Sequence, residues 1–88
     1  MCSKEITVVN ATGLHARPAS AFVTLAGKFK SNIYIQRAGD GKKSNGKSII
    51  MLMTLGLAQG EKATIFAEGE DEKEAVEALA DLVANMKD

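Results

Sequence analysis

The chain has 88 residues, of which 45% are hydrophobic and 25% are charged, and its 11 basic residues balance its 11 acidic residues. A domain of this size buries only about 60–65% of the surface that its unfolded chain exposes, so we expect one domain over residues 1–88 and no second core. This composition excludes disorder. A membrane span takes about 20 residues, and the longest apolar run, residues 49–58, is too short for it.

The first elements predicted are a strand and a helix. Residues 6–9 are β-branched with partial alternation and lead into a turn-rich segment, which predicts the first strand. Apolar residues then recur at three- and four-residue spacing from Ala16 to Phe29, which predicts an amphipathic helix. Pro18 is tolerated only in the first turn of a helix, so this helix begins at about His15 or Ala16.

The middle of the chain predicts a hairpin and a short helix. Residues 33–35 predict a second strand, and a turn leads from it into a short polar third strand over residues 42–45. The apolar run 49–53 follows Ser48 and precedes Gly56, which are an N-cap residue and a helix-terminating glycine.

The last part of the chain predicts a strand and a long helix. Residues 64–67 form the strand, and Asp71 with Glu74 resembles a capping box before a helix that runs to the end of the chain. The order is β-α-β-β-α-β-α. It predicts an α+β fold, an open-faced β-sandwich with a four-stranded, mainly antiparallel sheet and three helices on one face.

His15 is the only histidine, and it lies where a glycine-containing turn meets a predicted helix N-terminus. The partial positive charge there disfavours a second ring proton and leaves a neutral, nucleophilic imidazole. The free N–H groups of the helix end, together with Arg17, could hold a phosphoryl group on that ring. The alternative is that His15 and Arg17 are only the capped start of a helix.

Ser48 is explained most simply as a helix cap, but phosphorylation there would also be tolerated, because a dianion is favourable at a helix N-terminus. Ile49, Ile50 and Met53 cannot all point inward from so short a helix, so those left outside would form an apolar patch suited to a partner. Met51 and Leu52 are expected in the core.

Several kinds of site are not expected. With one histidine and one cysteine the chain cannot build a structural zinc site, and its glycines form no phosphate-binding loop, so we expect no metal, cofactor or nucleotide. Residues 1–48 carry eight basic and two acidic residues. These charges are either two solvated faces or a basic end near Arg17 and Lys47 that attracts phosphate or an acidic protein. Nucleic-acid binding is not expected, because the basic half lacks interleaved aromatics.

The segment Gly13-Leu14-His15-Ala16-Arg17-Pro18-Ala19 resembles the histidine-containing phosphocarrier (HPr) family of the bacterial phosphoenolpyruvate-dependent sugar phosphotransferase system. The resemblance covers essentially the whole chain and continues through residues 46–49, 54–57, 60 and 67–72. Residues 39–45 are about two residues longer than in common members. Ser48-Ile49-Ile50-Met51 stands where many Gram-positive relatives have Ser-Ile-Met-Gly.

The resemblance implies that enzyme I phosphorylates a ring nitrogen of His15, with assistance from Arg17, and that an enzyme IIA then takes the phosphoryl group. Ser48 would match the serine that a dedicated kinase phosphorylates in many Gram-positive bacteria, where that form acts in catabolite repression and a transcriptional regulator is a further partner. Ile49, Ile50 and Met53 would match the partner-docking surface.

Three functional hypotheses follow. The first is a phosphocarrier, which is a substrate of two enzymes and no enzyme itself. The second is a regulatory member of the family, either of its nitrogen-related branch or signalling through Ser48. The third, a stand-alone acid/base enzyme, would need a deep pocket with a second ionisable group. A cytoplasmic protein is expected, because the single cysteine, Cys2, cannot form an internal disulfide. Cys2 is interpreted as an incidental residue of a frayed terminus. A monomer is expected, because transient docking to several partners favours one.

Overall fold

The computed structural model of the chain describes residues 1–9, 11, 13 and 16–86, and within them it contains four strands and three helices in the predicted order. The elements are β1 (Cys2–Thr7), α1 (Ala16–Ala26), β2 (Asn32–Arg37), β3 (Lys43–Asn45), α2 (Ile49–Leu55), β4 (Lys62–Glu68) and α3 (Glu72–Ala84).

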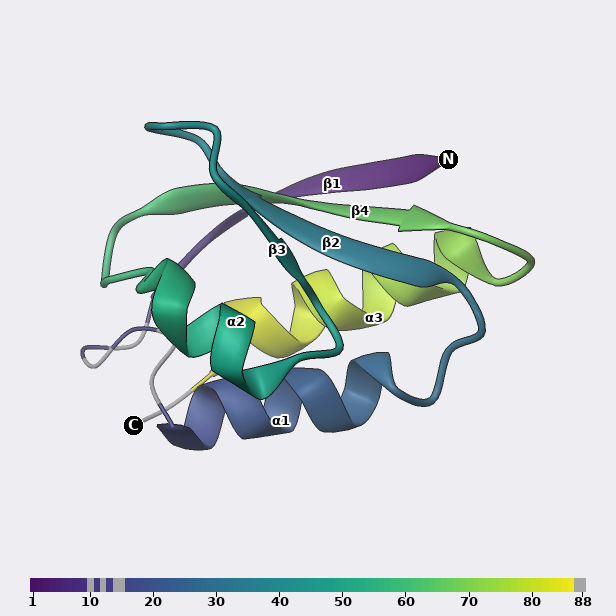
Figure 1. Cartoon of the computed structure of the whole chain (residues 1–88), viewed down its shortest axis with the longest axis horizontal. Helices are drawn as coiled ribbons and strands as arrows, with labels where there is room; N and C mark the ends of the chain where they lie inside the picture. Colours follow the sequence, from purple (N-terminus) through teal and green to yellow (C-terminus); the bar gives the residue numbers. More distant parts are fainter. Residues whose placement is uncertain (10, 12, 14–15, 87–88) are drawn as a thin grey trace.

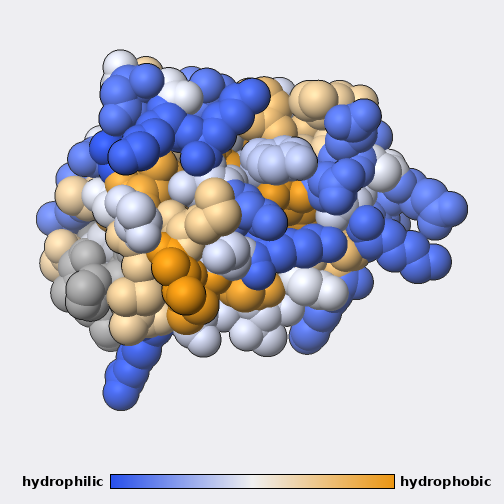
Figure 2. Space-filling model, viewed as in Figure 1, coloured by the Kyte–Doolittle hydropathy of each residue, from blue (hydrophilic) through white to orange (hydrophobic). Residues whose placement is uncertain are grey.

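The four strands form one sheet in the order β1-β4-β2-β3, and every neighbouring pair is antiparallel. The three helices lie on one face of this sheet (Figure 1). Helix α3 packs against β1 and β4, α2 packs against β3, and α1 packs against the other two helices. The predicted α+β open-faced sandwich is confirmed. In the same view, apolar surface gathers in the region that α2 occupies (Figure 2).

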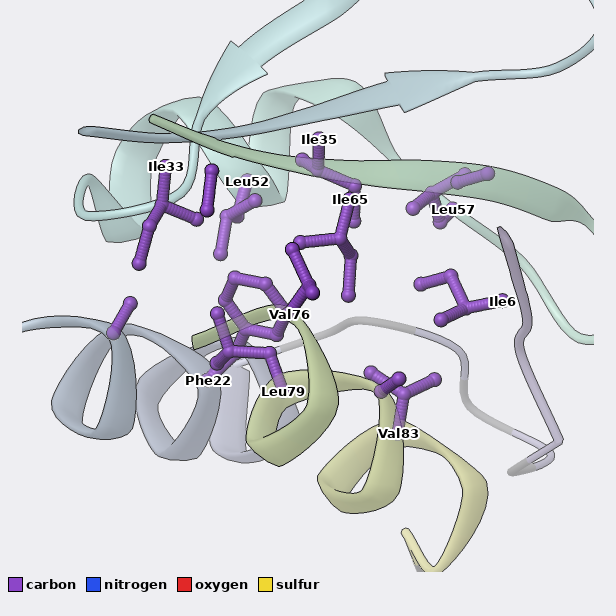
Figure 3. Close-up of a cluster of buried hydrophobic side chains, with 14 of the residues drawn as sticks. Ile6, Phe22, Ile33, Ile35, Leu52, Leu57, Ile65, Val76, Leu79 and Val83 are labelled. Atoms are coloured by element: carbon purple, nitrogen blue, oxygen red, sulfur yellow. The ribbon is translucent and has the colours of Figure 1, made fainter. Parts of the chain in front are cut away.

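The core lies between the sheet and the helices. Strand β2 turns Ile33 and Ile35 towards the helices, and β4 does the same with Ile65, because alternate strand residues point to opposite faces. Phe22 from α1 and Leu79 from α3 meet them from the other side (Figure 3). Full burial of one such side chain contributes about 1.5–3 kcal/mol, so this cluster supplies most of the driving force for folding.

Strand β1 differs from its predicted position. It begins at Cys2, which pairs with Ala67 of β4 and is half-buried against the core, so the prediction of a frayed terminus is wrong. The N-terminal amino group also forms a 2.9 Å ion pair with Glu72. Val8 and Val9, predicted as strand, lie past its end. Pairing with β4 overrides the weak strand propensity of the polar residues that begin the chain.

Helix α1 is shorter than its apolar pattern predicts. It ends at Ala26, and Phe29 contacts the core from the turn that follows. Ala16, placed on the apolar stripe by spacing, is exposed. Both differences arise at the ends of the helix, where the apolar spacing pattern defines the boundary least well.

The predicted capping box before α3 is wrong. Asp71 occupies the N-cap position but makes no side-chain bond to the helix. Its carboxylate instead accepts bonds from the Ser31 hydroxyl (2.5 Å), the Ser31 N–H (3.0 Å) and the Lys30 N–H (2.8 Å). These bonds, first among them that of the Ser31 hydroxyl, hold the pKa of Asp71 below its ordinary value. Asp71 thus ties the loop between α1 and β2 to the start of α3.

Candidate functional site

The predicted phosphorylation residue, His15, lies outside the described residues, as does Leu14. The residues on either side of this pair are described. Gly13 is buried, and Ala16 is the first residue of α1. In the sequence, His15 therefore immediately precedes a helix of 11 residues.

Gly13 fixes how the chain approaches α1. Its φ angle is 70°, in the left-handed region that favours glycine. A Cβ atom at this position would overlap the carbonyl oxygen of Leu57 and come within 2.9 Å of the Ala58 Cα. The backbone just before α1 therefore lies against the segment that follows α2, and no side chain fits between the two.

Arg17 is exposed in the first turn of α1, and Pro18, next to it, is buried. The first N–H groups of a helix have no partner within the helix and carry partial positive charge. No acidic residue lies in this turn to neutralise that charge. The N-terminus of α1 can therefore attract an anion, and the Arg17 guanidinium is long enough to add hydrogen bonds to it.

Helix α2 carries an exposed apolar surface that we call the α2 patch. Its members are Ile49, Ile50, Met51 and Met53, exposed by 36%, 74%, 44% and 41%. The prediction that Ile49, Ile50 and Met53 do not all point inward is confirmed, and all three are exposed, but the prediction that Met51 lies in the core is wrong. Only Leu52 and Leu55 of α2 are buried, because the helix has seven residues and turns a single stripe inward.

Ser48 caps α2 as predicted. Its hydroxyl oxygen accepts a bond from the N–H of Met51 at 3.3 Å, and Gly56 ends the helix with a φ of 66°. The Ser44 hydroxyl donates to the carbonyl of Met51 at 3.1 Å and holds α2 against β3. These contacts fix α2 from one side and leave its patch free.

The structure does not gather all the predicted residues at one end. The Lys47 ammonium donates to the carbonyl of Phe29 at 2.8 Å, beyond the C-terminal end of α1, whereas Arg17 lies in the first turn of that helix. Eleven helical residues span about 16 Å. The interpretation of Arg17 and Lys47 as one basic end is therefore wrong.

Two hollows of the described surface lie away from these residues. One of about 380 Å³ lies between β1 and α3, with Lys4, Glu5 and Asp81 in its lining, and another of about 300 Å³ lies beside Arg37 and Glu61. Neither is lined by Arg17 or by the α2 patch.

Comparison with known proteins identifies the family. The family described as the PTS HPr component phosphorylation site matches residues 2–85. This chain belongs to the HPr family. Among relatives in the family, phosphocarrier protein HPr of Borreliella burgdorferi is 46% identical over 88 residues, which cover 100% of both chains. HPr-like protein Crh of Halalkalibacterium halodurans is 49% identical over 79 residues, or 90% of this chain and 92% of Crh.

Solved HPr structures have the same fold. HPr-C-His from Thermoanaerobacter tengcongensis superposes with a TM-score of 0.89 at 49% identity, over 96% of this chain and 92% of that chain. Membership of the HPr family supports a phosphocarrier role in the phosphotransferase system and interaction with the enzymes of that system. HPr is a phosphocarrier protein. None of the described helices has the length and apolarity to cross a bilayer.

Proposed function

We propose that this chain is a phosphocarrier whose His15 accepts a phosphoryl group from phospho-enzyme I and passes it to an enzyme IIA. The observation that carries the proposal is the family match over residues 2–85, in a chain whose one histidine directly precedes α1. The exposed Arg17 and the absence of acidic residues from the first turn of α1 support it, because both favour a bound anion.

The proposed step is a nucleophilic displacement at phosphorus. A ring nitrogen of His15 forms a bond to phosphorus while the bond from phosphorus to its donor breaks. In the second transfer, enzyme IIA forms the new bond to phosphorus and the bond between phosphorus and His15 breaks. Backbone N–H groups at the start of α1 and the Arg17 guanidinium bind the equatorial oxygens. The chain returns to its starting state after each pair of transfers, without a metal or a cofactor of its own.

The α2 patch is the proposed docking surface for both enzymes. Four exposed apolar side chains on one short helix are suited to burial against a partner. The end of α2 adjoins the approach to α1, since Gly13 lies against Leu57 and Ala58. A partner seated on α2 would therefore reach the start of α1. We also propose that the carrier works as a cytoplasmic monomer.

A regulatory role is the second candidate, because a relative 49% identical to this chain is the HPr-like protein Crh. In this role, a kinase would phosphorylate Ser48, and the added dianion would sit at the cap of α2, where it is tolerated. Since Ser48 directly precedes Ile49 and Ile50 of the α2 patch, this modification would act on docking at α2. The presence of His15 favours the carrier over the purely regulatory role.

The test is to incubate the purified protein with phosphoenolpyruvate and enzyme I and to measure its intact mass. We expect one added phosphate that is acid-labile and base-stable, as a phosphohistidine is, and that is absent from the folded His15→Ala variant. No adduct in the presence of a competent enzyme I would refute the carrier role. The protein would then be offered to a serine kinase with ATP, and Ser48→Ala would serve as the matched control.

A further inference from the structure

The α2 patch contains two thioethers in an exposed position. Met51 and Met53 are 44% and 41% exposed, and neither belongs to the buried core. Met86, by contrast, is half-buried and packs against the core from the end of α3. Met1 is exposed, but at the start of β1, away from the patch. Half of the patch residues are therefore oxidisable, and oxidants in solution can reach them directly.

We propose that Met51 and Met53 form a reversible oxidation site that weakens partner docking at α2 when a peroxide converts them to methionine sulfoxide. This inference rests on the proposed function of the α2 patch. It adds a chemical modification, and thus a redox response, to the docking surface.

The step balances with a peroxide as the only co-reactant. With hydrogen peroxide, the sulfur lone pair attacks one oxygen of the O–O bond, that bond breaks, and the second oxygen takes up the proton of the first and leaves as water. Each sulfur loses two electrons and the peroxide gains them. Methionine sulfoxide reductases reverse the change with thiol reductants, one enzyme for each sulfoxide epimer.

The fold should tolerate this oxidation. Helix α2 is held through Leu52 and Leu55, both at most 2% exposed, and through the Ser44 hydroxyl, which bonds the backbone carbonyl of Met51 and not its side chain. The Ser48 cap likewise uses the backbone N–H of Met51. An added oxygen on either sulfur therefore lies on a side chain that makes none of these contacts, and it displaces none of them.

Docking, in contrast, should be sensitive to the added oxygen. A sulfoxide is a polar hydrogen-bond acceptor, and it loses its bonds to water when an apolar partner surface covers it. An acceptor buried without a partner opposes binding, whereas a thioether of the same length is favourable there. Two such groups on one four-residue patch would lower kcat/KM for phosphorylation by enzyme I by about tenfold or more.

The experiment treats the protein with hydrogen peroxide in a Cys2→Ser background, which removes the competing thiol. Trypsin separates the two patch methionines from Met1 and Met86, since cleavage after lysine yields the peptides 1–4, 48–62 and 74–87. We expect oxygen to appear in peptide 48–62 before peptide 74–87, an unchanged melting temperature, and a loss of kcat/KM that the reductases restore. The Met86→Leu variant should show the same loss. The Met51→Leu/Met53→Leu variant should keep its own untreated rate after peroxide.

Other results would overturn the inference. Earlier oxidation of Met86 than of the patch, a lowered melting temperature once peptide 48–62 has gained oxygen, or an unchanged kcat/KM with both patch sulfurs oxidised would each refute it. The last result leaves the carrier role intact, because the untreated protein is then still phosphorylated. If the untreated protein accepts no phosphoryl group at all, the proposed function fails, and the inference fails with it.

Discussion

Replacing Gly13 by alanine should damage both the stability of the fold and the approach to α1. An alanine held at a φ of 70° costs about 1–2 kcal/mol. Its Cβ would also overlap the Leu57 carbonyl, and overpacking of this kind costs a further ~1–3 kcal/mol. Gly60 is the matched control, because its φ is 86° but a Cβ there meets no atom within 4 Å. Gly60→Ala should therefore show the backbone cost alone.

The assay is thermal and urea unfolding of both variants, followed by circular dichroism. Gly13→Ala should be less stable than Gly60→Ala by about 1–3 kcal/mol, which corresponds to a difference of at least about 4 °C in Tm. At a temperature where both are folded, Gly13→Ala should accept phosphate from enzyme I at least about tenfold more slowly, since a small misplacement of reacting groups is costly. Equal stability and equal rates in the two variants would show that the contact between Gly13 and the Leu57–Ala58 segment does not matter.

Three further predictions test other parts of the structure. Arg17→Ala should slow phosphoryl acceptance by about tenfold to a hundredfold without lowering Tm, and an unchanged rate would remove Arg17 from the mechanism. Leu52→Ala should destabilise the fold by about 2–5 kcal/mol, because Leu52 is buried. Ile50→Ala, on the exposed side of the same helix, should change stability by less than about 0.5 kcal/mol and instead raise KM for the partner enzyme. Similar losses of stability in both variants would contradict the assigned faces of α2. The pKa of Asp71 is lowered by folding, so its stabilisation is present at neutral pH and is lost as pH falls through that lowered pKa. Asp71→Asn should therefore lower Tm at neutral pH, and the difference in Tm between the variant and the parent protein should disappear below about pH 4. A difference in Tm that persists in acid would mean that the charge of Asp71 is not the cause.

The elements that were predicted correctly depend on local chemistry. Ser48 and Gly56 frame α2 because a hydroxyl N-cap and a left-handed glycine satisfy the ends of any helix. Strands β2 and β4 follow from short runs that contain β-branched and aromatic residues, Ile33-Tyr34-Ile35 in β2 and Thr64-Ile65-Phe66 in β4. Residues around the predicted site, above all Arg17, could likewise be assigned to the first turn of a helix from Pro18 and the apolar spacing alone.

The features that the sequence did not predict depend on contacts between distant segments. Asp71 was assigned to its own helix by a capping pattern, but its carboxylate binds Lys30 and Ser31, about 40 residues away in the chain. Strand β1 begins at Cys2 only because β4 is there to pair with it. Met51 could have been recognised as exposed, since Leu52 and Leu55 at three-residue spacing already supply the buried stripe of α2.

The central claim is that the chain both accepts and donates a phosphoryl group, and onward transfer tests it most directly. The protein would be labelled with radioactive phosphate through enzyme I, purified away from it, and mixed with an enzyme IIA. We expect the label to move to enzyme IIA and the chain to return to its unmodified mass, ready for a second round of labelling. Label that stays on the chain, or that appears only as inorganic phosphate, would contradict the carrier role.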